Sequence, residues 1–197
     1  MRSFQSDELL IATHNKGKAK EISALLRPYV RKFYTSSDLG LPEPEETGKT
    51  FAENAEIKAL SAAKISNKVA LADDSGLVVK SLGGAPGIYS ARWAGEGRDF
   101  SKAMLKIHDS LADSMDRSAY FVCILALGWP DGHSEFFEGR IDGKIVWPKR
   151  GSNGFGYDPI FQVEGYEITF GEMAPDEKHK ISHRAMAFNQ LVDKCLK

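Results

Sequence analysis

The sequence has little cysteine. Only Cys123, within the apolar segment FVCILAL, and Cys195, near the C-terminus, occur in 197 residues, and their spacing matches no metal-binding motif. Free cysteine is often buried as a small hydrophobic residue, so we expect two buried thiols. We therefore assign no chemistry to these two cysteines.

Long apolar runs and an excess of charge of one sign are also absent. No segment approaches the roughly 20 apolar residues that span a membrane, and the N-terminal MRSFQSDELL lacks the basic start and apolar region of a signal peptide. Lysine and arginine number 26 against 27 aspartate and glutamate, so the net charge of -1 gives no overall field for holding a nucleic-acid backbone. We therefore expect no membrane contact, no nucleic-acid partner and a cytoplasmic location. A small anionic ligand is compatible with this composition.

The composition is otherwise that of a globular protein. Charged residues make up 27% of the chain and hydrophobic residues 42%, which argues against a disordered, fibrous or membrane class. Since a domain usually contains roughly 100 to 200 residues, we expect a single domain over residues 1–197.

Strands and helices alternate in the first part of the sequence, whereas strands separated by turn sequences follow one another in the second. Helices are predicted to begin at about Lys18, after the capping box Thr50–Glu53, after Asp99 and after Ser182. Strands are predicted at 9–13, 69–72, 77–79, 119–127, 134–139 and 144–147. This order indicates an α/β fold with a mixed sheet covered by helices.

The segment LADDSGLVV places two carboxylates in what otherwise looks like a buried strand. An ionised carboxylate is costly to bury unless it is paired or bound to a metal, so Asp73 and Asp74 suggest a cation site at a strand end. Adjacent strand residues point to opposite faces, so one aspartate is expected to be catalytic and the other structural. Oxygen ligands without nearby histidine or cysteine clusters favour Mg²⁺ or Mn²⁺, and Glu45 or Glu46 could supply a second carboxylate. A turn or capping role for both aspartates is the alternative.

A lysine-rich turn follows the first predicted strand. Its residues are Thr13, His14, Asn15, Lys16, Gly17 and Lys18. Backbone N–H groups at a helix start, together with ammonium groups, suit phosphate binding. The motif GxxxxGK[ST] is absent, which argues against an ATPase or kinase of that class. Lysines that simply face water are the alternative. Further along, Asn54 and Lys58 share one face of the second predicted helix.

Two late motifs carry aromatic and basic residues. Phe155 and Tyr157 of GFGYD can form a platform for stacking a base, or they can be core aromatics beside a tight turn. His183 and Arg184 are expected in the first turn of the last helix, where the helix dipole disfavours cations, and such a conflict often marks function.

A role without function is the alternative for His183 and Arg184. They can be exposed to solvent, or they can pair with Asp176 and Glu177.

Ordered motifs extend over nearly the whole chain. They are T-x-N-x-x-K at 13–18, EETG-x-TF-x-ENA-x-x-KA at 45–59, ADDSGL at 72–77, LGGAPGIYSAR at 82–92, GFGYDPIF at 154–161 and EKHKISHRAMA at 177–187. In these motifs the sequence resembles the inosine/xanthosine triphosphate pyrophosphatases, enzymes that remove non-canonical purine nucleotides.

The resemblance implies an elongated α/β fold with a central mixed sheet flanked by helices, two lobes with a nucleotide cleft between them, and a homodimer. It also implies a reaction. ITP, dITP or XTP would be hydrolysed between the α and β phosphates to the monophosphate and pyrophosphate, with Mg²⁺ or, as a substitute, Mn²⁺. A related pyrophosphatase with another base preference, and a non-catalytic nucleotide- or RNA-binding module, are the alternatives.

By the same resemblance, Asp74 would be the general base and a metal ligand, and Glu46, or else Glu45, the second carboxylate near Mg²⁺. Lys18 and Lys58 would oppose the triphosphate charge. The loop Thr13–Lys18 would surround the phosphates, although His14 and Lys16 occupy variable positions. The remaining substrate contacts would be Ser75, Phe155, Gly156, Tyr157, Asp158, Lys178, His183 and Arg184.

Overall fold

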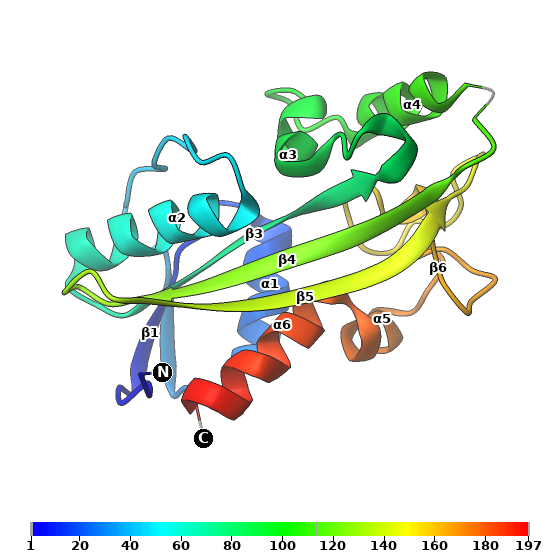
Figure 1. The fold of residues 1–197 in the computed structure, drawn as a ribbon. Coiled ribbons are helices and arrows are strands. Elements are labelled where there is room, and N and C mark those ends of the chain that lie inside the picture. Colours follow the sequence, from blue (N-terminus) through cyan, green and yellow to red (C-terminus); the bar gives the residue numbers. More distant parts are fainter. Residues whose placement is uncertain (1, 113, 197) are drawn as a thin grey trace. The chain divides into compact units, whose positions relative to one another are not determined.

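The computed structural model describes residues 2–112 and 114–196 and contains a six-stranded sheet in the order β2-β1-β3-β4-β5-β6 (Figure 1). Its strands are β1 Glu8–Ile11, β2 Lys32–Thr35, β3 Ala70–Val79, β4 Ser118–Gly128, β5 Ser134–Ile145 and β6 Phe161–Val163. β1 pairs in parallel with β2 and β3, whereas β5 and β6 are antiparallel. The predicted α/β fold with a mixed sheet is confirmed.

The helices that begin at Lys16, Phe51, Phe100 and His183 were predicted from the sequence, whereas the two short helices Ser90–Trp93 and Pro175–Ile181 were not. The helices are α1 Lys16–Leu26, α2 Phe51–Ser66, α3 Ser90–Trp93, α4 Phe100–Leu111, α5 Pro175–Ile181 and α6 His183–Leu191, followed by a π-helical turn Val192–Leu196. The capping box of α2 and the capping of α4 by Asp99 are both present, so backbone N–H groups at these helix starts have partners. None of the helices in the described ranges is both long and apolar enough to cross a membrane.

The described residues form two compact units that share strands. Unit 1 contains the chain up to Asp74, residues 123–139 and the chain from Ala185 onward, and unit 2 contains residues 75–122 and 140–184. The boundaries fall inside β3, β4 and β5, so each of these strands contributes to both units.

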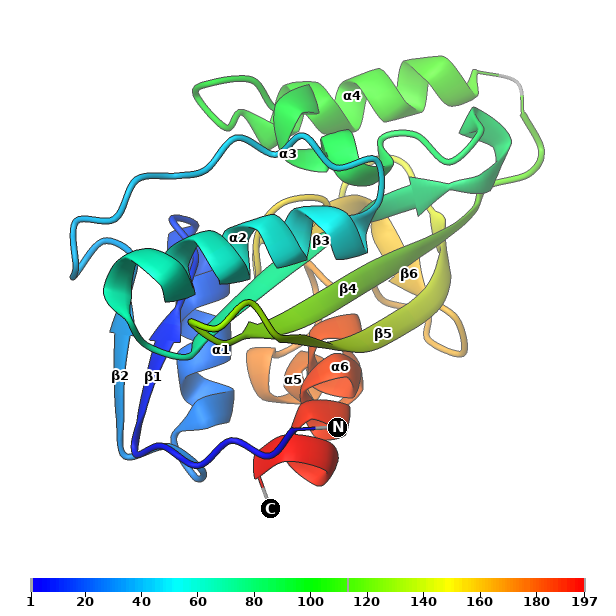
Figure 2. The same ribbon diagram turned by 60° about the vertical axis from the view of Figure 1, so that its left-hand side comes forward.

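Unit 1 has helices on both faces of its strands (Figures 1 and 2). On one face, buried apolar residues of β1, β3 and β4 pack against α1 and α6, and the two cysteines belong to this core as free thiols, as predicted. On the other face, α2 presents small buried residues, among them Ala59. A Cβ atom at Gly128 of β4 would lie only 3.1 Å from the Cβ of Ala59. Small side chains therefore allow α2 to approach the strand closely.

Unit 2 is built around α4. Its buried face, Ala103, Met104, Ile107 and Leu111, follows the predicted helical spacing and packs into an apolar core with residues of β3, β4, β5 and β6. The short 3₁₀ helix Asp158–Ile160, which directly precedes β6, also belongs to this unit.

Two sequence predictions about strands are wrong. β3 runs without a break from Ala70 to Val79. Its two aspartates form ion pairs with lysines, so they can lie within the strand instead of ending it. The strands predicted at 134–139 and 144–147 form one strand, because the turn expected at Asp142 and Gly143 is absent and β5 continues through these residues. A Cβ at Gly143 would lie 2.3 Å from the carbonyl oxygen of Gln162 in β6, so this glycine serves close strand approach instead of a turn.

Candidate functional site

The turn between β1 and α1 is organised by its own polar side chains. Asn15 caps α1, because its Oδ1 accepts hydrogen bonds from the N–H groups of Gly17, at 2.9 Å, and Lys18, at 3.2 Å. The hydroxyl of Thr13 accepts from the Asn15 N–H group at 3.2 Å. The first turn of α1 contains no acidic residue, so the positive end of the helix dipole is not offset there.

The other two residues of this turn point elsewhere. His14 Nε2 lies 3.0 Å from the carbonyl oxygen of Leu41, and Lys16 is exposed. The Lys18 ammonium is 3.1 Å from Asp73 Oδ2, and the Asp73 side chain is fully buried. Asp73 thus pairs with a lysine of the turn.

Lys58 lies between two carboxylates in unit 1. Its Nζ is 2.9 Å from Glu46 Oε1 and 3.0 Å from Asp74 Oδ1. The side chains of Lys58 and Asp74 are only 11% and 8% exposed, whereas that of Glu46 is 29% exposed. One ammonium is therefore shared by a buried carboxylate and by one that solvent reaches.

Burial and charge act against each other in this cluster. Burial raises the pKa of Asp74, and the ammonium groups of Lys58 and Lys18 only partly offset this. Burial alone would lower the pKa of Lys58, but Asp74, Asp73 and Glu46 outweigh it, so the pKa of Lys58 is raised. Lys58 therefore stays charged, and Asp74 is a stronger proton acceptor than an ordinary aspartate.

In unit 2, a buried ion pair secures the GFGYD turn. Lys178 Nζ lies 2.6 Å from Asp158 Oδ2, with both side chains 4% exposed, and the same oxygen accepts the N–H group of Phe155 at 2.8 Å. Gly154 has a φ of +71°, and a Cβ there would collide with the Asp158 carboxylate, so only glycine fits.

Next to this turn, unit 2 buries two further basic residues. Arg184 is 2% exposed and donates a hydrogen bond to the Ser75 hydroxyl at 3.0 Å, whereas His183 is 4% exposed and stacks on Phe121 at a centroid distance of 4.9 Å. The interpretation that these two cations are exposed is therefore wrong. The ring of Phe155 is half-buried and has Lys178 Nζ 5.1 Å from its centroid.

Tyr157 has a different role from Phe155. Its ring is 3% exposed, meets Phe100 edge-on at 5.2 Å, and its hydroxyl donates to the Ser90 carbonyl oxygen at 2.8 Å. Burial raises the pKa of this hydroxyl, which stays protonated. Of the two interpretations of these aromatic residues, that of a core residue applies to Tyr157, because its ring belongs to the apolar core of unit 2.

Comparison with known proteins agrees with these motifs. Residues 9–194 match the profile of the Ham1 family. The chain belongs to the Ham1 family. Proteins named dITP/XTP pyrophosphatase from Agrobacterium fabrum and Ruegeria pomeroyi are 50% and 53% identical to it. The first alignment covers 100% of this chain and 99% of the relative, and the second covers 98% of both.

Solved Ham1 structures have the same fold. The chain superposes on a HAM1 protein from Coxiella burnetii with a TM-score of 0.87 and 42% identity, over 94% of this chain and 96% of that one. For the Ham1 protein of Staphylococcus aureus the TM-score is 0.82 and the identity 41%, over 93% and 95%.

The acidic cluster of this Ham1 chain has the donor set for a divalent cation. Asp74 Oδ2 is buried, and nothing within the described ranges donates a hydrogen bond to it. No group of three histidine, cysteine or acidic residues in those ranges could hold a metal unaided. Mg²⁺ is commonly held by one or two carboxylates together with substrate phosphates, so Glu46 and Asp74 fit a cation that arrives with a phosphorylated ligand.

The structure also distinguishes the two candidate glutamates. Glu46 contacts Lys58, whereas Glu45 is exposed. The Glu46 segment is fastened to α2, since the Gly48 N–H group donates to Asn54 Oδ1 at 2.9 Å. Asn54 was not among the predicted site residues; its helical spacing from Lys58 is the signal that could have indicated it.

Proposed function

We propose that this chain hydrolyses non-canonical purine nucleoside triphosphates, namely dITP, ITP and XTP, to the monophosphate and pyrophosphate. The observation that carries the proposal is the cluster of Lys58, Glu46 and Asp74, which combines a cation suited to phosphate with carboxylates suited to a metal and to water activation. Relatives about half identical over the full chain are named dITP/XTP pyrophosphatase, which supports the same reaction.

The lysines of unit 1 are assigned to the phosphates. Lys18 and Lys58 bring two ammonium groups, and α1 contributes backbone N–H groups at its N-terminus. Both ammonium groups are paired with carboxylates, and these ion pairs hold them in position. Positioned charges of this kind stabilise the negative charge of a phosphoryl transition state without reorganisation.

Asp74 is assigned as the general base. Its raised pKa favours proton acceptance, and its Oδ2 carries no hydrogen bond from the described residues. Mg²⁺, or Mn²⁺ in its place, would be held by Glu46 and Asp74 and would supply Lewis-acid neutralisation of phosphate charge. Asp74 would then orient and deprotonate the water that attacks the phosphorus.

The base is assigned to unit 2. Arg184, His183 and backbone N–H groups are hydrogen-bond donors, and a purine with a carbonyl oxygen at the position of the adenine amino group would accept from them. Adenine would leave a buried donor without a partner, a mismatch that can produce roughly 10⁴-fold discrimination in a hydrogen-bonding site. Phe155 is half-buried and offers the ring face for stacking, whereas Tyr157 and Asp158 support the turn from within.

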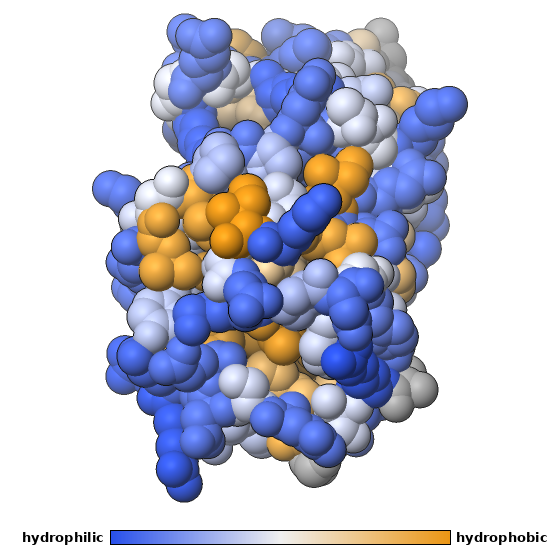
Figure 3. Space-filling model, turned by 90° about the vertical axis from the view of Figure 1, so that its left-hand side faces the viewer, coloured by the Kyte–Doolittle hydropathy of each residue, from blue (hydrophilic) through white to orange (hydrophobic). Residues whose placement is uncertain are grey.

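We also propose that the protein is a homodimer in the cytoplasm, where a nucleotide-pool enzyme meets its substrates. Large apolar side chains are exposed in both units, including Ile65 at 55% and Tyr89 at 49%. Figure 3 shows hydrophobic side chains among hydrophilic ones on the surface. Exposed apolar side chains are candidates for contacts between subunits.

The test is pyrophosphate release from ITP, XTP, dITP, GTP, ATP and dUTP, each with Mg²⁺ and with EDTA. Metal-dependent pyrophosphate from the first three, with little from GTP or ATP, is the expected result. Preference for dUTP would indicate a pyrophosphatase for another base. Release of single phosphates, or no turnover together with salt-sensitive RNA retention, would contradict the proposal.

A further inference from the structure

We propose that Lys58 is a resident counter-ion: in the nucleotide-free protein its ammonium takes the place of the divalent cation between Glu46 and Asp74, and it moves to a phosphate only when a triphosphate binds. This inference rests on the proposed function, and it states that the metal binds well only together with the triphosphate. It predicts that the free protein binds a divalent cation poorly.

The contacts of Lys58 are the first step. Its Nζ reaches Glu46 Oε1 at 2.9 Å and Asp74 Oδ1 at 3.0 Å, so one ammonium is shared by both carboxylates and offsets one of their two charges. A metal ion held by the same two carboxylates would lie close to the ammonium and would repel it. Occupation by Lys58 and occupation by a metal therefore compete.

The rest of the cluster gives the metal little compensation. Two carboxylates and one ammonium leave a net charge of only -1, and the described residues include no third acidic, histidine or cysteine side chain grouped with them. The neighbouring carboxylate, Asp73, is taken up by Lys18 at 3.1 Å. Asp74 Oδ2 is a buried acceptor to which none of the described residues donates a hydrogen bond.

A triphosphate changes this balance. Its anionic oxygens offer Lys58 a new partner, which frees Glu46 and Asp74 for a cation. Lys58 is attached to α2 by a flexible four-carbon stem, so the ammonium can move without movement of the helix. Metal and triphosphate would then bind with positive coupling, and coupling of this kind is reciprocal.

The experiment measures Mn²⁺ binding without any nucleotide, by electron paramagnetic resonance of the free ion. The variants are Lys58→Gln, which removes the charge but keeps an N–H donor, and Lys58→Arg, which keeps the charge. Lys68→Gln is the matched control, because Lys68 pairs at 2.7 Å with Glu8, outside this cluster. We expect Lys58→Gln to bind Mn²⁺ at least about tenfold more tightly than the wild type, and the other two variants to stay within about twofold.

Equal or weaker Mn²⁺ binding by folded Lys58→Gln would overturn the proposal, as would tight binding by the wild type. If Lys58→Gln does not fold, the nitrogen resonance of the Lys58 ammonium in the wild type, assigned by its loss in Lys58→Arg, decides instead. Mg²⁺ alone should leave this resonance in place, and a shift with Mg²⁺ alone would contradict the proposal. Neither readout uses nucleotide, so failure of the pyrophosphate assay remains a separate result.

Discussion

Both units bury a lysine against an aspartate, but they satisfy these charges to different degrees. In unit 2, Lys178 and Asp158 are each 4% exposed, and the Asp158 oxygen also receives the Phe155 N–H group. In unit 1, Lys58 is shared between Asp74 and the partly exposed Glu46, and Asp74 keeps a buried oxygen to which no described residue donates.

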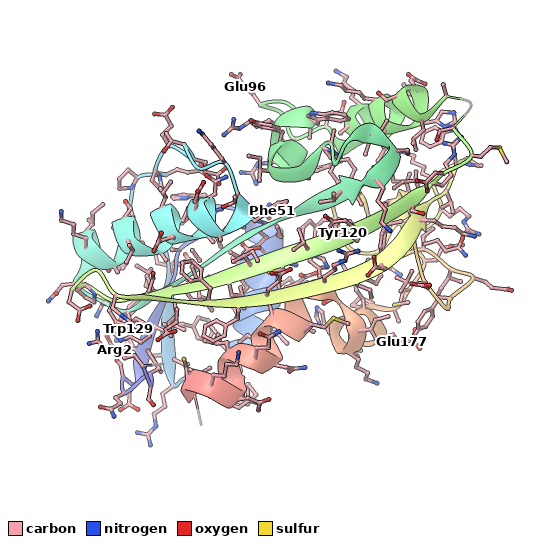
Figure 4. All side chains as sticks on the ribbon, in the orientation of Figure 1. Arg2, Phe51, Glu96, Tyr120, Trp129 and Glu177 are labelled. Carbon is pink, nitrogen blue, oxygen red and sulfur yellow. The ribbon has the colours of Figure 1, made fainter. Side chains whose placement is uncertain are left out.

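The difference indicates which buried charges serve structure and which serve a ligand. A buried ion pair needs additional hydrogen bonds to offset its desolvation, and the Phe155 N–H group donates such a bond to the unit 2 pair. The unit 1 cluster remains incompletely satisfied, which is costly unless a ligand completes it. We therefore interpret Asp158 as a positioning residue for the GFGYD turn and Asp74 as a residue that contacts the reacting groups. Figure 4 shows the side chains of both units on the fold.

The largest predicted effect is that of Asp74→Asn. A general base usually contributes about 10²- to 10⁴-fold, so kcat should fall by at least that factor. The measurement is steady-state pyrophosphate release from ITP. Asp142→Asn is the control, since Asp142 also lies in a strand and pairs with a basic residue, Arg140, but at the surface. A rate for Asp74→Asn within tenfold of the wild type would contradict the assignment.

The unit 2 pair should respond mainly in stability. Asp158→Ala leaves a buried ammonium without its partner, and removing one member of such a pair typically lowers the free energy of unfolding by about 3–5 kcal/mol. Urea denaturation followed by circular dichroism measures this loss. The double variant Asp158→Leu with Lys178→Met should recover part of it, because no charge then remains buried. A decrease in the free energy of unfolding of less than about 1 kcal/mol would mean that the pair does not stabilise the fold.

Asn54 tests whether the Glu46 segment must be held in place. Asn54→Ala removes the acceptor of the Gly48 N–H group, a hydrogen bond whose loss costs about 1–3 kcal/mol when the group stays buried. We expect kcat/KM to fall about tenfold and the Mg²⁺ concentration for half-maximal activity to rise. Asn54→Asp keeps the Oδ1 acceptor and should restore most of the activity. Equal loss in both variants would argue that the amide N–H group matters instead.

The smallest effect is expected at a surface lysine–carboxylate cluster. Hydrogen bonds from Lys68 and Lys32 lower the pKa of Glu8 from 4.5 to about 2. Because this pKa is depressed in the folded state, the stabilisation is present above pH 4.5 and disappears as the pH falls toward 2. Glu8→Gln should therefore be slightly less stable than the wild type at pH 7, and the difference should vanish near pH 2. A difference that persists in acid would point to packing as its source.

Much of the fold could be predicted from local signals in the sequence. The capping residues Thr50 and Asp99 and the apolar spacing of α4 depend on neighbours in the chain, and they located their helices correctly. The errors arose where distant residues decide the outcome. Asp73 and Asp74 look like the end of a strand until their lysine partners, supplied by α1 and α2, are known.

The site was predictable by residue type and less so by role. Phe155 and Tyr157 are similar in sequence context, and only the packing of Tyr157 against Phe100 separates the core ring from the half-buried one. The hydrogen bond from the Gly48 N–H group to Asn54 could not be predicted, since it depends on the path of the loop that precedes α2.

The lack of a side chain at Gly128 affects the position of Lys58, which lies on a neighbouring helix. Its missing Cβ lets α2 settle against β4 at Ala59, the residue after Lys58, and an added Cβ would lie 3.1 Å from the Ala59 carbonyl carbon. An alanine at position 128 would push the helix outward by a few tenths of an ångström, and the ammonium would move with it. Substitutions at Gly128, an uncharged residue at the end of β4, are thus limited by how accurately the Lys58 ammonium must be placed.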